Sequence, residues 1–140
     1  MLPIDNYTIA VFEKYFIYYK GLVSAVTEKF GKGLKVVHCT NANLDVTETI
    51  AYPVDLILFH IPLFTPLRKV RLLVKKIKER HHEAAIILYS GENRDDLAKS
   101  IDYLDIKGSF LLKDSLEDIM NEIEKVLYRK GERNVLVKID

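Results

Sequence analysis

The sequence lacks the features of a secreted or membrane-spanning protein. It has a single cysteine, Cys39, so no disulfide can form within one chain, which suits a reducing cytosol. No apolar run approaches the ~20 residues that a bilayer-spanning helix needs. Charged residues interrupt every apolar run near the N-terminus, where a signal peptide would have its apolar core. We therefore expect a soluble, cytoplasmic protein.

The chain also lacks a net charge that would attract a polyanion. Lys and Arg number 21 and Asp and Glu number 20, so the charges nearly cancel. Basic residues cluster between Arg68 and Arg80, but no aromatic residues interleave them as in many nucleic-acid-binding segments. We interpret this cluster as the solvated face of a helix. We expect no direct contact with nucleic acid and none with a membrane.

What the sequence contains is the composition of one folded domain. Of its 140 residues, 49% are hydrophobic and 29% are charged, which is typical of a single globular core. No internal repeat or low-complexity segment interrupts it, and we assign residues 1–130 to this domain. In the last segment, residues 131–140, Val135, Val137 and Ile139 alternate. That alternation fits a sixth strand as well as a linker or frayed tail.

The central feature is a short apolar run from Val54 to Pro62. Leu56 to Ile61 is apolar except for His60, and the run stops at a proline. Such a run indicates a strand that is buried on both faces of a parallel sheet. In parallel sheets, ligands bind beyond the carboxyl ends of the strands. We therefore expect His60, at the end of this strand, to lie in the functional region.

The remaining elements alternate along the chain. Further strands are predicted at Tyr7–Phe12, Leu34–Thr40, Ala84–Ser90 and Gly108–Leu112. Helices are predicted at Phe16–Phe30 and Leu44–Ala51, after Pro66, from Asn93 to Leu104, and from Ser115 to Leu127. Five strands that alternate with five helices predict an α/β fold, with a parallel sheet covered on both faces.

Three motifs give this order of elements a resemblance to a known family. Glu13-Lys14 precedes Lys20-Gly21-Leu22, Ile86–Gly91 ends in Ser90 and a small residue, and Gly108–Asp114 carries an aromatic three residues before a lysine. Together they resemble the receiver domain of bacterial two-component response regulators, most closely the LuxR type. The resemblance implies a flavodoxin-like (CheY-like) doubly wound sheet of five parallel strands in the order 2-1-3-4-5, flanked by five helices.

The resemblance also implies a role for each matching position. In receivers, two acidic residues after the first strand help to hold Mg²⁺, an Asp ending the third strand accepts the phosphoryl group, and Ser/Thr and Lys contact the phosphate. Here the acidic-pair positions hold Glu13 and Lys14, the phosphoacceptor position holds His60, the phosphate-contact positions hold Ser90 and Lys113, and the switch aromatic is Phe110.

Two of these substitutions change the charge of the site. Three carboxylates and a lysine sum to about −2, whereas Glu13, Lys14, neutral His60 and Lys113 sum to about +1. Mg²⁺ prefers carboxylate oxygens, so we expect that its site is lost and that no cofactor is bound. Without the metal, the charge of a transferring phosphoryl group lacks its main stabiliser. We expect a non-enzymatic domain with an atypical phosphorylation site.

Alternatives remain open for the same residues. His60 could accept phosphate on nitrogen or act as a pH sensor, but we favour a histidine that fills the pocket and hydrogen-bonds Glu13 or Ser90. A small anion could bind between Lys14, Ser90 and Lys113. We favour instead a pairing of Lys113 with Glu13 that locks the domain in one state.

Exposed aromatic residues suggest that the domain acts through partners. One helical stripe cannot bury all of Tyr15, Phe16, Tyr18 and Tyr19, so we expect one or two of them at the surface. Receivers commonly dimerise through helices one and five, or through helices four and five with strand five, where Tyr103 and Phe110 fall.

The sequence therefore predicts a phosphorylation-independent receiver that serves as an interaction or dimerisation module in two-component signalling or transcriptional regulation. It would control an attached or separate helix-turn-helix output domain. The alternatives are a phosphoacceptor with a non-standard residue and a small-anion sensor.

Overall fold

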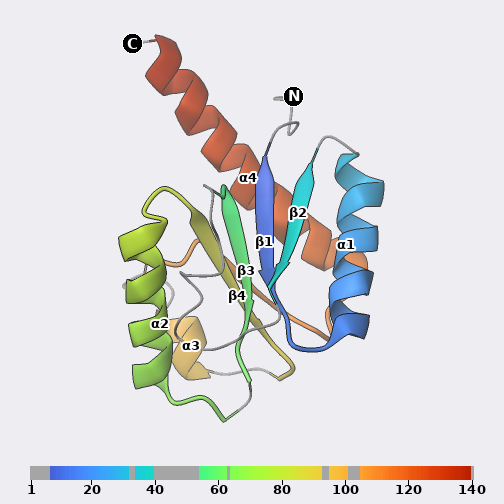
Figure 1. The fold of residues 1–140 in the computed structure, drawn as a ribbon, viewed down its shortest axis with the longest axis vertical. Helices are drawn as coiled ribbons and strands as arrows, with labels where there is room; N and C mark the ends of the chain where they lie inside the picture. The colour runs from blue at the N-terminus through green and yellow to red at the C-terminus, as the bar shows by residue number, and fades with distance from the viewer. Residues whose placement is uncertain are drawn as a thin grey trace.

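The computed structural model shows a parallel β-sheet between two layers of helices (Figure 1). It describes residues 7–31, 34–39, 54–62, 64–92, 95–100 and 105–139. The strands are β1 (Thr8–Phe12), β2 (Lys35–Cys39), β3 (Leu56–His60), β4 (Ala85–Ser90) and β5 (Gly108–Leu111). The helices are α1 (Phe16–Phe30), α2 (Leu67–Arg80), α3 (Asp95–Ser100) and α4 (Leu116–Ile139).

The strand order is β2-β1-β3-β4-β5, and every neighbouring pair is parallel. This confirms the predicted sheet and its order. Helices α1 and α4 lie on one face of the sheet, and α2 and α3 lie on the other (Figure 1). Because all strands run the same way, their carboxyl ends meet at one edge, which we call the carboxyl edge.

Alternation along the strands divides the core into two layers. Ile57 and Phe59 of β3 pack with the apolar stripe of α2 on one face, while Leu56 and Leu58 pack on the α1/α4 face. These four side chains are almost fully buried, as the continuous apolar run predicts for a central strand. The same alternation sends His60, two residues beyond Leu58, to the α1/α4 side.

Four helices lie within the described ranges, so the prediction of five is not supported there. The helix expected at Leu44–Ala51 lies outside the described residues. Of the helix expected from Asn93 to Leu104, α3 covers Asp95–Ser100. The first two and last four residues of that expected helix also lie outside the described residues.

The segment after residue 130 is helical up to Ile139, whereas its alternating pattern also fitted a sixth strand. Helix α4 continues to Ile139, and Figure 1 shows it running past the sheet. Once a helix is nucleated, each added residue gains one hydrogen bond, so a local strand-like pattern beginning at Val135 does not stop it. Gly131 costs only about 1 kcal/mol within such a helix. None of the helices in the part of the chain that the structure describes is long and apolar enough to cross a membrane.

Candidate functional site at the carboxyl edge

Strand register gathers four side chains into one row at the carboxyl edge. Phe12 pairs with Phe59, so the next residues, Glu13 and His60, come side by side. His60 pairs with Tyr89 of β4, and Tyr89 pairs with Phe110 of β5. The row therefore runs Glu13, His60, Tyr89 and Phe110 across β1, β3, β4 and β5.

The Glu13 carboxylate is the polar centre of this row. Its side chain is fully buried, and both of its oxygens receive hydrogen bonds. Oε1 accepts a 2.8 Å bond from the Tyr89 hydroxyl, and Oε2 accepts a 3.0 Å bond from the backbone N–H of Tyr15. Nδ1 of His60 lies 3.2 Å from Oε2. These contacts satisfy a carboxylate that would otherwise be costly to bury.

The contacts also set the ionisation of the two acidic groups. Burial alone would raise the pKa of Glu13, but the hydrogen bonds from His60, Tyr15 and Tyr89 outweigh burial and hold its pKa below the ordinary value. Burial and the adjacent Glu13 carboxylate both raise the pKa of the Tyr89 hydroxyl. The stable state at neutral pH is therefore ionised Glu13 with a neutral Tyr89 that donates to it.

The three rings of the row form a parallel stack. The ring centroids of His60 and Tyr89 are 5.1 Å apart with 10° between their planes, and those of Tyr89 and Phe110 are 4.8 Å apart with 5°. Tyr89 and Phe110 are both buried. The stack holds Phe110, for which the resemblance implies a switch role, in a buried position against Tyr89 of β4.

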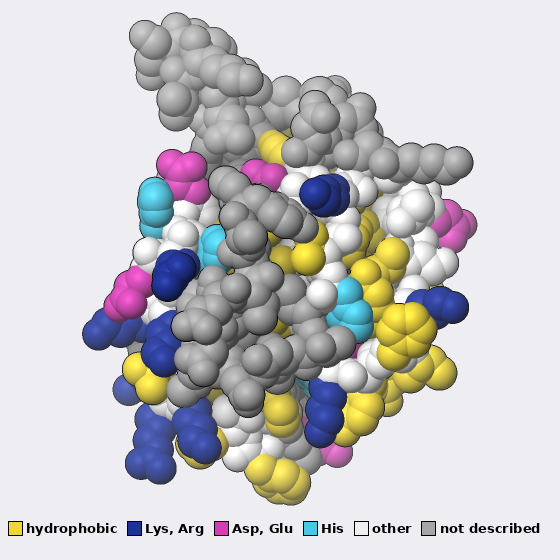
Figure 2. Space-filling view, in the orientation of Figure 1, with side chains coloured by type: hydrophobic (Ala, Val, Ile, Leu, Met, Phe, Trp, Pro, Cys, Tyr) yellow, Lys and Arg dark blue, Asp and Glu magenta, His cyan; other side chains and the backbone are white. Residues whose placement is uncertain are grey.

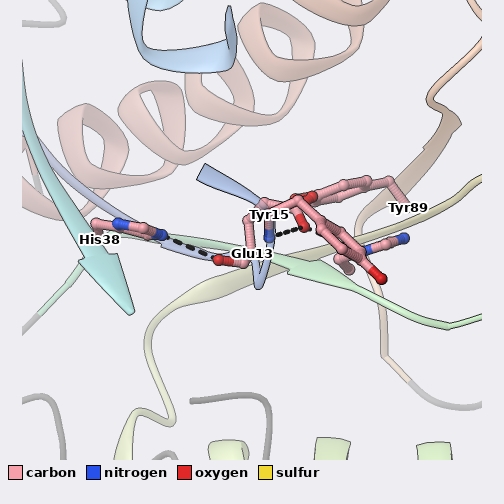
Figure 3. Close-up of polar contacts among 5 residues, drawn as sticks. Glu13, Tyr15, His38 and Tyr89 are labelled. Atoms are coloured by element: carbon pink, nitrogen blue, oxygen red, sulfur yellow. Dashed lines mark hydrogen bonds and ion pairs between the residues drawn. The ribbon is translucent and has the colours of Figure 1, made fainter. Parts of the chain in front are cut away.

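His38 supports the row from the other side of β1. Its Nε2 donates a 2.9 Å hydrogen bond to the backbone carbonyl of Glu13. Figure 3 shows Glu13 between His38 of β2 and Tyr89. The His38 ring stacks on Tyr19 of α1 with centroids 3.6 Å apart. His38 thus ties the β1–α1 turn to the neighbouring strand.

The other residues that the sequence singled out do not join this network. Lys14 is exposed, with Nζ 5.9 Å from the ring centroid of Tyr15. Ser90 is buried, and its hydroxyl donates a 2.8 Å bond to the carbonyl of Glu92. Lys113 is exposed in the turn after β5. Within the described residues, no hydrogen bond or ion pair joins these three side chains to one another.

The predicted pairing of Lys113 with Glu13 is wrong. Glu13 pairs with His60, because β3 is the neighbour of β1, whereas Lys113 follows β5, which lies three strands from β1. The predicted contact of His60 with Glu13 is present. Among the described residues, no group of three or more His, Cys, Asp or Glu side chains is arranged to hold a metal ion.

Sequence reasoning missed Tyr89 and His38. A signal for Tyr89 was available in the sequence. Alternation along β4 places its side chain on the same face as Ile87, and Tyr89 lies one residue before Ser90 at the end of the strand. Its partner Glu13 is 76 positions away, so only the strand register brings the two together. No comparable signal existed for His38, whose bond goes to a backbone carbonyl.

Comparison with solved structures identifies the fold. A response regulator from Thermotoga maritima has a TM-score of 0.71 and 16% identity over 87% of this chain and 98% of its own. A CheY-like receiver domain protein from Methanospirillum hungatei JF-1 has a TM-score of 0.73 and 12% identity over 91% of this chain and 98% of its own. The signal receiver domain of a putative Luxo repressor protein from Vibrio parahaemolyticus has a TM-score of 0.73 and 12% identity. That match covers 92% of this chain and 95% of the other chain.

The sequence matches no protein-family model and no curated protein. The likeness is therefore one of structure, at 12–16% identity in these three comparisons. What the comparisons show is the fold: the chain has the CheY-like fold that these receiver domains share.

Proposed function

We propose that this chain is a phosphorylation-independent, receiver-like domain. It acts without catalysis as a cytoplasmic interaction or dimerisation module in bacterial two-component signalling or transcriptional control. Its partner is a helix-turn-helix output domain or another regulator, and it does not contact nucleic acid itself. It is an atypical member of the LuxR type.

The single observation that carries this proposal is the state of the Glu13 carboxylate. Both oxygens are already occupied by donors from His60, Tyr15 and Tyr89. A metal ion would have to displace these donors from a buried site. Because the lost hydrogen bonds involve a charged group, breaking each would cost roughly 1.5–3 kcal/mol. The carboxylate that holds Mg²⁺ in receivers is here a structural group.

The residues beside Glu13 support the same conclusion. His60 stands where receivers have the phosphoacceptor carboxylate, and it is held by Glu13 and by the Tyr89 ring. Lys14 places an ammonium group at the second acidic position. A hard divalent cation binds oxygen ligands, so a cationic neighbour and an imidazole remove both the charge and the ligands that it needs.

One observation favours the phosphoacceptor alternative. A carboxylate that accepts from one imidazole nitrogen fixes the tautomer and orients the ring, and Glu13 contacts Nδ1 of His60 in this way. Nε2 would then be the phosphorylated atom. Incubation with acetyl phosphate tests this, because phosphohistidine is labile in acid and stable in alkali.

The deciding experiment is an amide NMR titration of the intact chain with Mg²⁺ and then with beryllofluoride, which mimics an aspartyl phosphate. We expect no clustered shifts at Glu13, Tyr15, Ser90 and Lys113. Shifts that saturate at these amides would overturn the proposal. The Lys14→Asp/His60→Asp/Tyr89→Phe variant restores both carboxylates and removes both side-chain donors from Glu13, so it serves as the positive control for the titration.

A further inference from the structure

All four described helices begin at the carboxyl edge, because each follows a strand that ends there. This edge also carries most of the exposed apolar surface. Of the eight large hydrophobic residues that are exposed in the described part of the chain, six lie at the starts of helices or in the loops that lead to them. They are Tyr15, Phe16, Ile17, Tyr18, Phe64 and Leu116.

The extent of this exposure goes beyond ordinary surface tolerance. Phe64 is 91% exposed and Ile17 is 76% exposed. The expectation of one or two exposed aromatics at the start of α1 is too low, since Tyr15, Phe16 and Tyr18 are all exposed while Tyr19 is half-buried. Figure 2 shows apolar side chains gathered along the lower margin of the molecule, beside basic ones. An apolar surface of this kind marks an interaction site.

Charge divides the carboxyl edge into two halves. Neither α1 nor α2 has an acidic residue in its first turn, and Lys14, Arg68 and Lys69 lie at their starts. The first turns of α3 and α4 are acidic, with Asp95 and Asp96 in one and Glu117 and Asp118 in the other. In the sheet, β1 and β3 precede the basic starts and β4 and β5 precede the acidic ones. The basic half and the acidic half are therefore adjacent.

Each half combines its charge with exposed apolar side chains. In the basic half, Nζ of Lys14 lies 5.9 Å from the Tyr15 ring centroid and Nζ of Lys20 lies 5.6 Å from that of Phe16. In the acidic half, the exposed Leu116 adjoins Glu117 and Asp118. Five of the six exposed apolar residues thus lie in the basic half and Leu116 lies in the acidic half, which remains acidic although it also carries the exposed Lys113.

We propose that the carboxyl edge is the interface for a second copy of this chain, related by a two-fold axis between β3 and β4. Such an axis places the basic half of each copy on the acidic half of the other, so the edge is complementary to itself, as an isologous interface requires. An anionic membrane would be repelled by the acidic half, and a basic partner by the basic half. Only a partner that also has a basic half beside an acidic half avoids like-charge repulsion from both halves of this edge.

This inference rests on the proposed interaction role and gives it a surface. The interface differs from the helix faces through which receivers commonly dimerise, because only the first turns of the helices take part. It would also cover Glu13 and His60, which lie at the same edge. Assembly would then close the site to phosphodonors, in agreement with a phosphorylation-independent domain.

Analytical ultracentrifugation of the full chain tests the interface. The wild type should form a dimer of twice the 16.2 kDa chain mass, weakened by salt. Lys14→Glu/Arg68→Glu/Lys69→Glu makes both halves acidic, and Asp95→Lys/Glu117→Lys/Asp118→Lys makes both halves basic. Each variant alone should dimerise at least about tenfold more weakly. An equimolar mixture of the two should form a heterodimer, and a chain that carries all six changes should dimerise again.

Lys75→Glu/Arg80→Glu/Lys125→Glu is the matched control, because it lowers the net charge as much as the first variant does, at exposed residues away from the carboxyl edge. It should dimerise like the wild type. A monomeric wild type, or single-half variants that dimerise normally, would overturn the interface. Circular dichroism establishes that each variant is folded. The beryllofluoride titration decides the phosphorylation-independent role separately, so the two proposals can fail independently.

Discussion

The hydroxyl of Tyr89 donates a 2.8 Å hydrogen bond to Oε1 of Glu13, over a separation of 76 residues in the sequence. Tyr89 lies on β4 and Glu13 follows β1, so the bond passes over β3, whose His60 ring stacks against the Tyr89 ring. One tyrosine therefore donates a hydrogen bond to a buried carboxylate and stacks on two neighbouring rings. The carboxyl edge is built as a packed structural element.

Removal of the Tyr89 hydroxyl should destabilise the domain without disturbing the ring stack. In Tyr89→Phe, Glu13 keeps its charge but loses one of its donors, so we expect the free energy of unfolding to fall by about 1.5–3 kcal/mol. Urea denaturation at neutral pH measures this loss. Tyr128→Phe is the matched control, because Tyr128 is exposed and its hydroxyl should contribute little. Equal stability of the two variants would mean that the Tyr89–Glu13 bond is energetically unimportant.

Tyr89 should also make the domain sensitive to alkali. Its pKa is raised in the folded state above the ordinary value of 10.0, so its contribution is complete below that pH and is lost as the pH rises. Above pH 10.0 the unfolded chain releases a proton that the folded chain retains, which lowers stability by about 1.4 kcal/mol per pH unit. Urea midpoints across this range should fall more steeply for the wild type than for Tyr89→Phe. Parallel curves would show that Tyr89 ionises in the folded protein.

Glu13 should make the domain sensitive to acid. The hydrogen bonds lower its pKa below 4.5, so its contribution to stability is complete above that pH and is lost as the pH falls through the native value. In Glu13→Gln this part of the acid dependence should disappear, although the variant is less stable at neutral pH because a charged acceptor is lost. Denaturation curves between neutral and acidic pH make the comparison. Glu28→Gln, an exposed change on α1, should retain the wild-type slope.

Much of the fold could be predicted because its determinants are local. The continuous apolar run Leu56–Phe59 indicates a strand buried on both faces, and alternating strands and helices imply a parallel sheet. The end of α4 could not be predicted in this way. The local pattern at Val135 and Val137 favours a strand, but a long helix already in progress prevails over it.

The candidate site was only half predictable. That His60 lies at a strand end follows from the apolar run, and its neighbour Glu13 follows from β1 and β3 being adjacent. The choice between Lys113 and His60 as the partner of Glu13 depends on distances across the sheet, which charge alone does not give. Tyr89 was passed over because a tyrosine on an apolar strand is commonly a core residue, and only register reveals the acceptor for its hydroxyl.

Restoring an acid at residue 60 should harm the domain. In His60→Asp, a second carboxylate would face the buried Glu13, which also loses the Nδ1 donor 3.2 Å away, and we expect a loss of about 3 kcal/mol at neutral pH. Two adjacent carboxylates raise the pKa of one of them, so this variant should gain stability as the pH falls through that raised value, opposite to the wild type. His60→Asn adds no charge and should show a smaller loss without the inverted slope. Thermal unfolding with and without Mg²⁺ completes the comparison: with Lys14 retained, Mg²⁺ should not restore the His60→Asp variant. A clear Mg²⁺-dependent rise in its melting temperature would mean that the carboxyl edge can still assemble a metal site.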